Sequence, residues 1–123
     1  MTTSVDIPVS MPGVRAARFM TDELHAGVKE HYAVGRVERG CTEWWGGGRV
    51  WQSKPGSIMV KQPGDVHRDL KRSPATAFTL ITLPADEVER ARAGHKALAF
   101  PQLDAHDPRG RPFQRLHDAV RAG

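Results

Sequence analysis

Short apolar runs alternate with turn residues along the first two thirds of the chain. Five of these runs stand out: "HYAVGRV", "CTEWW", "RVWQS", "GSIMVKQ" and "AFTLITL". Gly- or Pro-containing turns separate them, among them Gly46-Gly47-Gly48, Pro55-Gly56 and Pro63-Gly64. Strands of this length and spacing are typical of a β-sandwich or a β-barrel. The triple glycine lacks the strand-to-helix setting of a phosphate-binding loop, so it predicts a hairpin turn.

The pattern becomes helical after Leu83. The segment 84–94, "PADEVERARAG", has acidic residues in its first turn, arginine in its last and a glycine beyond, which predicts a short helix. The segment 111–123 places Phe113, Leu116 and Val120 at helical spacing. We therefore expect a barrel over residues 1–84 and a helical segment over 85–123, within one domain. The apolar stripe requires a covering surface, which is the barrel, a second subunit or a domain outside this chain.

Length and composition limit the class of protein. The chain has 123 residues, of which 39% are hydrophobic and 26% charged, as in a soluble protein with one modest core. Its apolar runs are shorter than a membrane span, and the N-terminal residues do not resemble a signal peptide. The single cysteine, Cys41, excludes an internal disulfide and a multi-cysteine zinc site. These observations favour the cytoplasm.

Positive charge is concentrated near the C-terminus. The formal net charge is +4. Residues 1–88 carry 11 Lys and Arg against 10 Asp and Glu, whereas residues 89–123 carry 7 against 4. A solvated basic tail explains this distribution, and proximity to a polyanion is the alternative. The basic residues are not interleaved with aromatic residues as a single-strand nucleic-acid surface requires.

The order of elements resembles a known family. "HYAVGRVERG" leads through "WWGGGRVWQSKPGSIMVKQPGDVH" to "FTLITLPADEVERA". This succession resembles the N-terminal, cupin-type ligand-binding domain of AraC-family transcription regulators, over roughly residues 12–123. The resemblance implies a mainly β fold, a small cupin-like antiparallel β-barrel of the double-stranded β-helix or jelly-roll kind, with C-terminal helices.

The resemblance also directs attention to a metal site. Metal-binding cupins carry an H-x-H pair, a glutamate and one later histidine, and His67 matches the later histidine. The pair would fall where this chain has Gly27 and Lys29. A site of His31, His67 and Glu38 stays open, although His31 and Glu38 have opposite parity in a regular strand. We expect no cofactor and no metal, with His31 and His67 as weak candidate ligands.

A ligand pocket inside the barrel is the second expectation. Lys29 is either an inward cation that an anionic ligand would neutralise, or a side chain that reaches solvent at the barrel mouth. Small residues at inward positions leave room for a ligand or for a large side chain from across the core. Adjacent Trp44 and Trp45 face opposite sides of a strand, so we expect one in the core and one at an interface. The predicted ligand-binding residues are Lys29, His31, Ala33, Gly35, Trp51 and His67.

The resemblance implies a sensory function. We expect a small-molecule effector-binding and dimerisation domain of a transcription regulator, forming a homodimer through a helix within residues 84–123. In the family, DNA is bound through helix-turn-helix motifs, and we find none in this sequence. The alternative is a stand-alone metal-dependent cupin enzyme, such as a dioxygenase or an isomerase. The missing H-x-H disfavours that alternative, so we expect no enzymatic activity.

Overall fold

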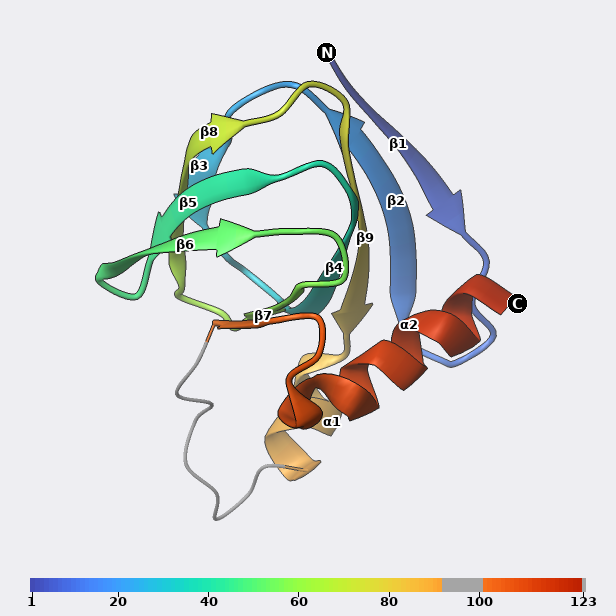
Figure 1. Cartoon of the computed structure of the whole chain (residues 1–123). Helices are drawn as coiled ribbons and strands as arrows, with labels where there is room; N and C mark the ends of the chain where they lie inside the picture. The colour runs from blue at the N-terminus through green and yellow to red at the C-terminus, as the bar shows by residue number, and fades with distance from the viewer. Residues whose placement is uncertain (92–100, 123) are drawn as a thin grey trace.

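Two antiparallel sheets make up most of the computed structural model, which describes residues 1–91 and 101–122 (Figure 1). The first sheet contains six strands in the order β1-β2-β9-β4-β7-β10, and the second contains four in the order β3-β8-β5-β6. The strands are β1 (Thr2–Ile7), β2 (Arg15–Thr21), β3 (Ala26–Val28), β4 (Tyr32–Arg39), β5 (Thr42–Gly46), β6 (Arg49–Ser53), β7 (Ile58–Lys61), β8 (Val66–Arg72), β9 (Thr76–Leu83) and β10 (Gln102–Leu103). The helices are α1 (Ala85–Ala91), the 3-10 turn η1 (Pro108–Gly110) and α2 (Arg111–Ala122).

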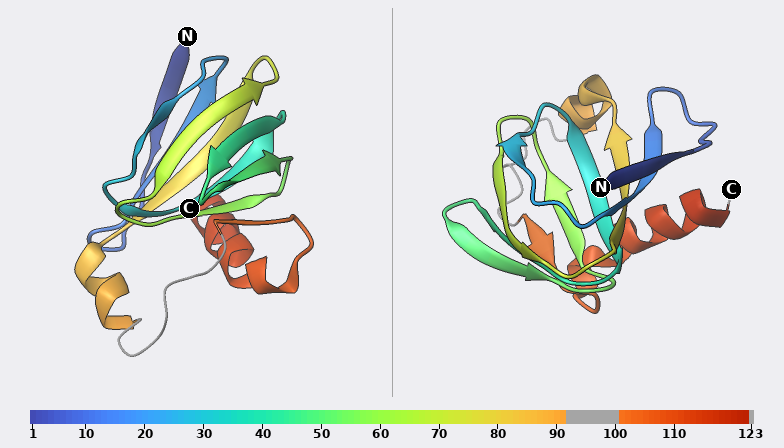
Figure 2. Two further views of the ribbon diagram at one scale, coloured as in Figure 1. Left: turned by 90° about the vertical axis from the view of Figure 1, so that its left-hand side faces the viewer. Right: turned by 90° about the horizontal axis from the view of Figure 1, so that it is seen from above.

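The two sheets face each other and enclose an interior, as the view from above shows (Figure 2). The five predicted runs became β4, β5, β6, β7 and β9, in an antiparallel arrangement, so the predicted barrel is confirmed. The triple glycine forms the predicted hairpin: β5 and β6 pair up to Gly46 and Arg49, and Gly47 and Gly48 adopt φ of 59° and 74°. Glycine tolerates this left-handed conformation without a steric cost, and two such residues match a tight hairpin.

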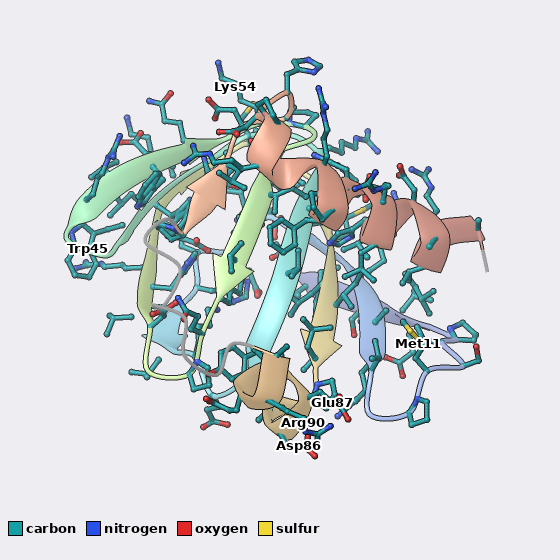
Figure 3. All side chains as sticks on the ribbon, turned by 90° about the horizontal axis from the view of Figure 1, so that it is seen from below. Met11, Trp45, Lys54, Asp86, Glu87 and Arg90 are labelled. Atoms are coloured by element: carbon teal, nitrogen blue, oxygen red, sulfur yellow. The ribbon has the colours of Figure 1, made fainter. Side chains whose placement is uncertain are left out.

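Helix α2 packs against the outer face of the six-stranded sheet (Figure 3). Phe113 contacts a cluster of buried residues centred on Val34 and Ile58, and Leu116 and Val120 contact a second cluster around Ile81. The apolar stripe predicted from the sequence is therefore covered by the chain's own barrel. Docking explains how so short a helix forms, because isolated helices of this length are marginal in water.

The other predicted helix is confirmed at its start. Helix α1 follows β9 directly, and the Tyr32 hydroxyl donates a hydrogen bond to the Glu89 carboxylate. Its first turn carries Asp86 and Glu87, which favour a helix N-terminus. The predicted stop at Gly94 lies outside the described residues.

The chain returns to the barrel after residue 100. Strand β10 pairs with β7, and the buried Gln102 side chain reaches the other sheet, where its amide donates to the Gln52 carbonyl at 2.8 Å. Gln102 also accepts hydrogen bonds from Ser53 and from the Trp44 indole. This part of the predicted helical segment therefore closes the barrel. Among the described residues, no helix is long and apolar enough to cross a membrane.

Candidate functional site

A pocket of about 160 Å³ opens between the two sheets. Alternation along β7 explains part of its lining: Ile58 and Val60 belong to the cluster beneath α2, whereas Met59 and Lys61 point into the barrel. The lining includes charged, aromatic and thioether side chains that could contact a ligand, namely those of Lys29, Trp44, Met59, Lys61, Asp65 and His67.

An aromatic stack forms one wall of the pocket. The imidazole of His67 on β8 lies over the Trp44 ring on β5, with centroids 4.8 Å apart and planes inclined by 19°. Trp51 on β6 stacks behind Trp44 at 6.0 Å. Trp44 is only 4% exposed, and its indole N–H donates to Ser53 Oγ at 2.9 Å. The wall is therefore fixed in place before any ligand binds.

Asp69 holds His67 in its orientation. Both residues point inward from β8, since residues two positions apart lie on the same face of a strand. His67 Nε2–H donates to Asp69 Oδ1 at 2.6 Å, and Oδ2 accepts from the His25 backbone N–H at 2.9 Å and from Arg72 at 2.7 Å. Burial alone would raise the pKa of Asp69, but these hydrogen bonds outweigh burial and hold the pKa well below its usual range. The carboxylate is therefore ionised, and both of its oxygens accept hydrogen bonds within the protein.

The imidazole of His67 is neutral at physiological pH. Burial lowers the pKa of His67 below its ordinary value, and the hydrogen bond to Asp69 only partly opposes this effect. The nearby Lys61 ammonium lowers the pKa further. With Nε2–H bound to Asp69, the imidazole presents its ring face to Trp44.

Two lysines meet at the pocket. The backbone of Lys29 is fixed on the 63–65 turn, because its N–H donates to the Asp65 carbonyl and its carbonyl accepts from the Gly64 N–H, both at 2.8 Å. Its side chain lies beside that of Lys61. Burial, followed by repulsion from Lys29, lowers the pKa of Lys61 from 10.5 to about 7. The pocket therefore brings the side chains of Lys29 and Lys61 together, and the Lys61 amine is only partly protonated at neutral pH.

The predicted ligand-binding residues separate into two groups. Lys29 and His67 line the pocket together. Ala33 and Gly35 face the interior from β4, opposite Lys61 and Met59 respectively. At Gly35, however, the Met59 methyl group would lie 3.0 Å from an added Cβ, so the Met59 side chain fills the space beside this glycine.

The two remaining predicted residues lie apart from the pocket lining. His31 is exposed before β4. Trp51 supports Trp44 from behind, donates its indole N–H to the Gly46 carbonyl and lies under the Arg49 guanidinium. The predicted difference in burial between the two adjacent tryptophans is confirmed, since Trp44 is buried and Trp45 is 38% exposed. A role for Trp45 at an interface stays a prediction.

The conceivable metal site does not assemble among the described residues. Glu38 lies on the α2 side of the six-stranded sheet, where it pairs with Arg36 at 3.1 Å and Arg121 at 3.7 Å. His67 lies inside the barrel and His31 is exposed. Within residues 1–91 and 101–122, no three His, Cys, Asp or Glu side chains gather as a metal would require.

Sequence reasoning missed Lys61, Asp69 and the role of Trp44. Asp69 shares strand parity with His67, and that spacing could have revealed it. Lys61 follows three apolar residues, and parity alone does not say which of them face the interior when both faces of the strand are covered. The required information was the position of α2.

Comparisons with solved structures support the fold. The AraC-like transcriptional activator CuxR superposes with a TM-score of 0.59 at 15% identity, over 89% of this chain and 42% of CuxR. The EutQ protein of Clostridium difficile gives 0.57 at 15% identity, over 69% of both chains. A Cupin 2 conserved barrel domain protein from Salinispora arenicola gives 0.56 at 15% identity, over 76% of this chain and 85% of that protein. These likenesses establish a cupin-type barrel.

No protein of curated function matches the sequence. A family match covers nearly the whole described structure, from Val14 in the loop before β2 to the end of α2. The matching family is described as the AraC-like ligand binding domain, over residues 14–123. The chain belongs to the AraC-like ligand-binding domain family.

Proposed function

We propose that this chain is the small-molecule effector-binding and dimerisation domain of an AraC-type transcription regulator that acts in the cytoplasm. The observation that carries the proposal is the pocket between the sheets, where Lys29 and Lys61 face an aromatic wall of His67 and Trp44. Mostly apolar walls with a few convergent polar groups are typical of ligand pockets. In this proposal His67 contacts the ligand and performs no catalytic step, and Asp69 fixes its ring through Nε2.

The proposal includes a route from the pocket to α2. Strand β7 presents Met59 and Lys61 to the pocket and Val60 to the cluster that Phe113 of α2 contacts. Its neighbour β4 offers the Val34 carbonyl to His117 of α2 at 3.0 Å. Only strand β7 therefore lies between a ligand at Lys61 and the apolar cluster beneath α2. In the proposed regulator, contact with DNA belongs to a separate helix-turn-helix part.

A ligand screen with a matched histidine control tests the proposal. Monosaccharides, amino acids and small carboxylates are screened by thermal denaturation, and at least one is expected to stabilise the chain, because a ligand that binds only the folded state raises its stability. His67→Ala is expected to reduce that stabilisation, whereas His106→Ala, at an exposed position outside the pocket, leaves it unchanged. A ligand that raises the melting temperature of wild type and of His67→Ala by the same amount would show that His67 only supports the fold.

A further inference from the structure

Two amines share a small pocket whose nearest carboxylates, Asp65 and Asp69, accept hydrogen bonds from groups other than these amines. Asp69 uses both oxygens on His67, Arg72 and the His25 N–H. Asp65 Oδ2 accepts the Gln62 backbone N–H at 3.0 Å. Neither Lys29 nor Lys61 forms an ion pair with a carboxylate of the described residues.

This arrangement is unfavourable without a ligand. An amine taken out of water loses hydration, and a second ammonium beside it adds repulsion. The backbone of Lys29 is nevertheless fixed by two hydrogen bonds to the 63–65 turn, and Lys61 lies in the regular β4–β7 pairing opposite Ala33. The fold therefore holds the two amines together, and a negative charge between them would relieve both costs.

We propose that the effector bound in this pocket is a small oxyanion, a carboxylate or a phosphate, held between the ammonium groups of Lys29 and Lys61. This inference rests on the function proposed above and names the ligand class. A cavity of about 160 Å³ admits a small metabolite. The Trp44 and Met59 side chains provide an apolar surface for the carbon skeleton of a carboxylate.

Binding is coupled to proton uptake at Lys61. The charged and titratable groups around this amine among the described residues are Lys29, Asp65, His67 and Asp69. Because the pKa of Lys61 is about 7, roughly half of the free protein carries a neutral amine there at pH 7. An oxyanion favours the ammonium form, so the affinity for a carboxylate, which stays ionised over this range, is expected to rise by about tenfold from pH 8 to pH 6.

Isothermal titration calorimetry tests the inference with three probes: succinate, inorganic phosphate and the neutral analogue succinamide. Succinate or phosphate is expected to bind, and succinamide is not. Lys29→Met and Lys61→Met are expected to weaken anion binding by about tenfold or more, since each removes a charge-assisted contact. Lys71→Met removes an exposed lysine of β8 and serves as the charge-matched control with unchanged binding. The preference between succinate and phosphate identifies the source of the oxyanion.

A pH series separates a specific site from general attraction to a basic protein. The increase in affinity from pH 8 to pH 6 is expected to vanish in Lys61→Met and to persist in Lys71→Met. The melting temperature of Lys61→Met should equal or exceed that of wild type, because a poorly hydrated amine is removed. Failure of both anions to bind at millimolar concentration, or equal binding by Lys61→Met, would overturn the inference. A neutral ligand found by the thermal screen that still depends on His67 would overturn only the anionic class and leave the proposed effector function standing.

Discussion

At the scale of single residues, Asp69 organises the candidate site. Its carboxylate connects β8 to the segment before β3 through the His25 N–H, neutralises Arg72 and fixes the His67 ring against Trp44. Since the side chain is only 2% exposed, these hydrogen bonds must replace its lost hydration. The position of His67 is therefore a consequence of a buried charge that sequence reasoning had left aside.

Asp69→Asn is expected to lower the free energy of unfolding at pH 7 by about 2 kcal/mol, because Arg72 loses a buried anionic partner. The folded-state pKa of Asp69 lies below the unfolded value, so its contribution is complete above about pH 4 and declines as the pH falls further. Urea denaturation from pH 7 to pH 2 measures this difference.

The difference between wild type and Asp69→Asn should therefore shrink only below about pH 4. Asp65→Asn is a suitable comparison, since Asp65 is less buried and its side chain caps a turn through the Gln62 N–H. A constant difference between the Asp69 variant and wild type down to pH 2 would contradict an ionised, hydrogen-bonded Asp69.

The sequence was informative at residue positions where turn chemistry sets the geometry. His67 follows the Pro63-Gly64 turn, and both its inward direction and its place in the pocket agree with the pattern. Gly35 was ambiguous, because a small inward residue is consistent with either a cavity or a large neighbour. Met59 supplies the neighbour, and only three-dimensional packing could reveal it.

At the scale of elements, α2 is anchored by a histidine. His117 is 1% exposed, its Nε2–H donates to the Val34 carbonyl at 3.0 Å, and its Nδ1 is buried without a partner. Burial and the nearby Arg36 lower the pKa of His117 to about 4. Protonation would therefore oppose the docked position of the helix.

Acid is consequently expected to loosen α2. A folded-state pKa below the unfolded value means that the contribution is complete above about pH 6.5 and is lost as the pH falls toward 4. His117→Met is expected to remove about 2 kcal/mol of the decrease in unfolding free energy between pH 7 and pH 5. Chemical denaturation at both pH values measures this change, and His106→Met is the exposed control. An identical pH dependence in wild type and His117→Met would show that the pKa of this histidine is the same in the folded and unfolded states.

Element types were easier to predict than element partners. Helical spacing identified α2, and the glycine turn identified the β5–β6 hairpin. Hydrophobic spacing alone does not say which surface covers a helix, so the barrel, a second subunit and another domain stayed open. Strand β10 was missed because a two-residue strand carries almost no periodicity.

At the scale of the whole molecule, the packing of α2 changes the expectation for self-association. The homodimer stays a prediction, but its predicted helical interface would have to compete with the barrel for the same apolar stripe. Leu116→Asp is therefore expected to lower the unfolding free energy by about 2 kcal/mol without changing the sedimentation coefficient of the folded protein. Arg115→Asp, next to it on an exposed position, is the control. A dimer that becomes a monomer in Leu116→Asp at unchanged stability would restore the helix to the subunit interface.

The positive charge of the molecule should give it a weak affinity for DNA. Exposed Arg111, Arg115 and Arg121 lie along α2, so this chain should bind duplex DNA weakly and without regard to sequence. Fluorescence anisotropy is expected to show an affinity that falls by about tenfold or more between 50 and 200 mM salt. Replacing Arg111 and Arg115 by Gln should weaken binding to every duplex equally, because phosphate contacts carry no sequence information. A defined footprint on one duplex, lost in that double variant, would instead mean that α2 reads bases, and the separation of effector binding from DNA recognition would fail.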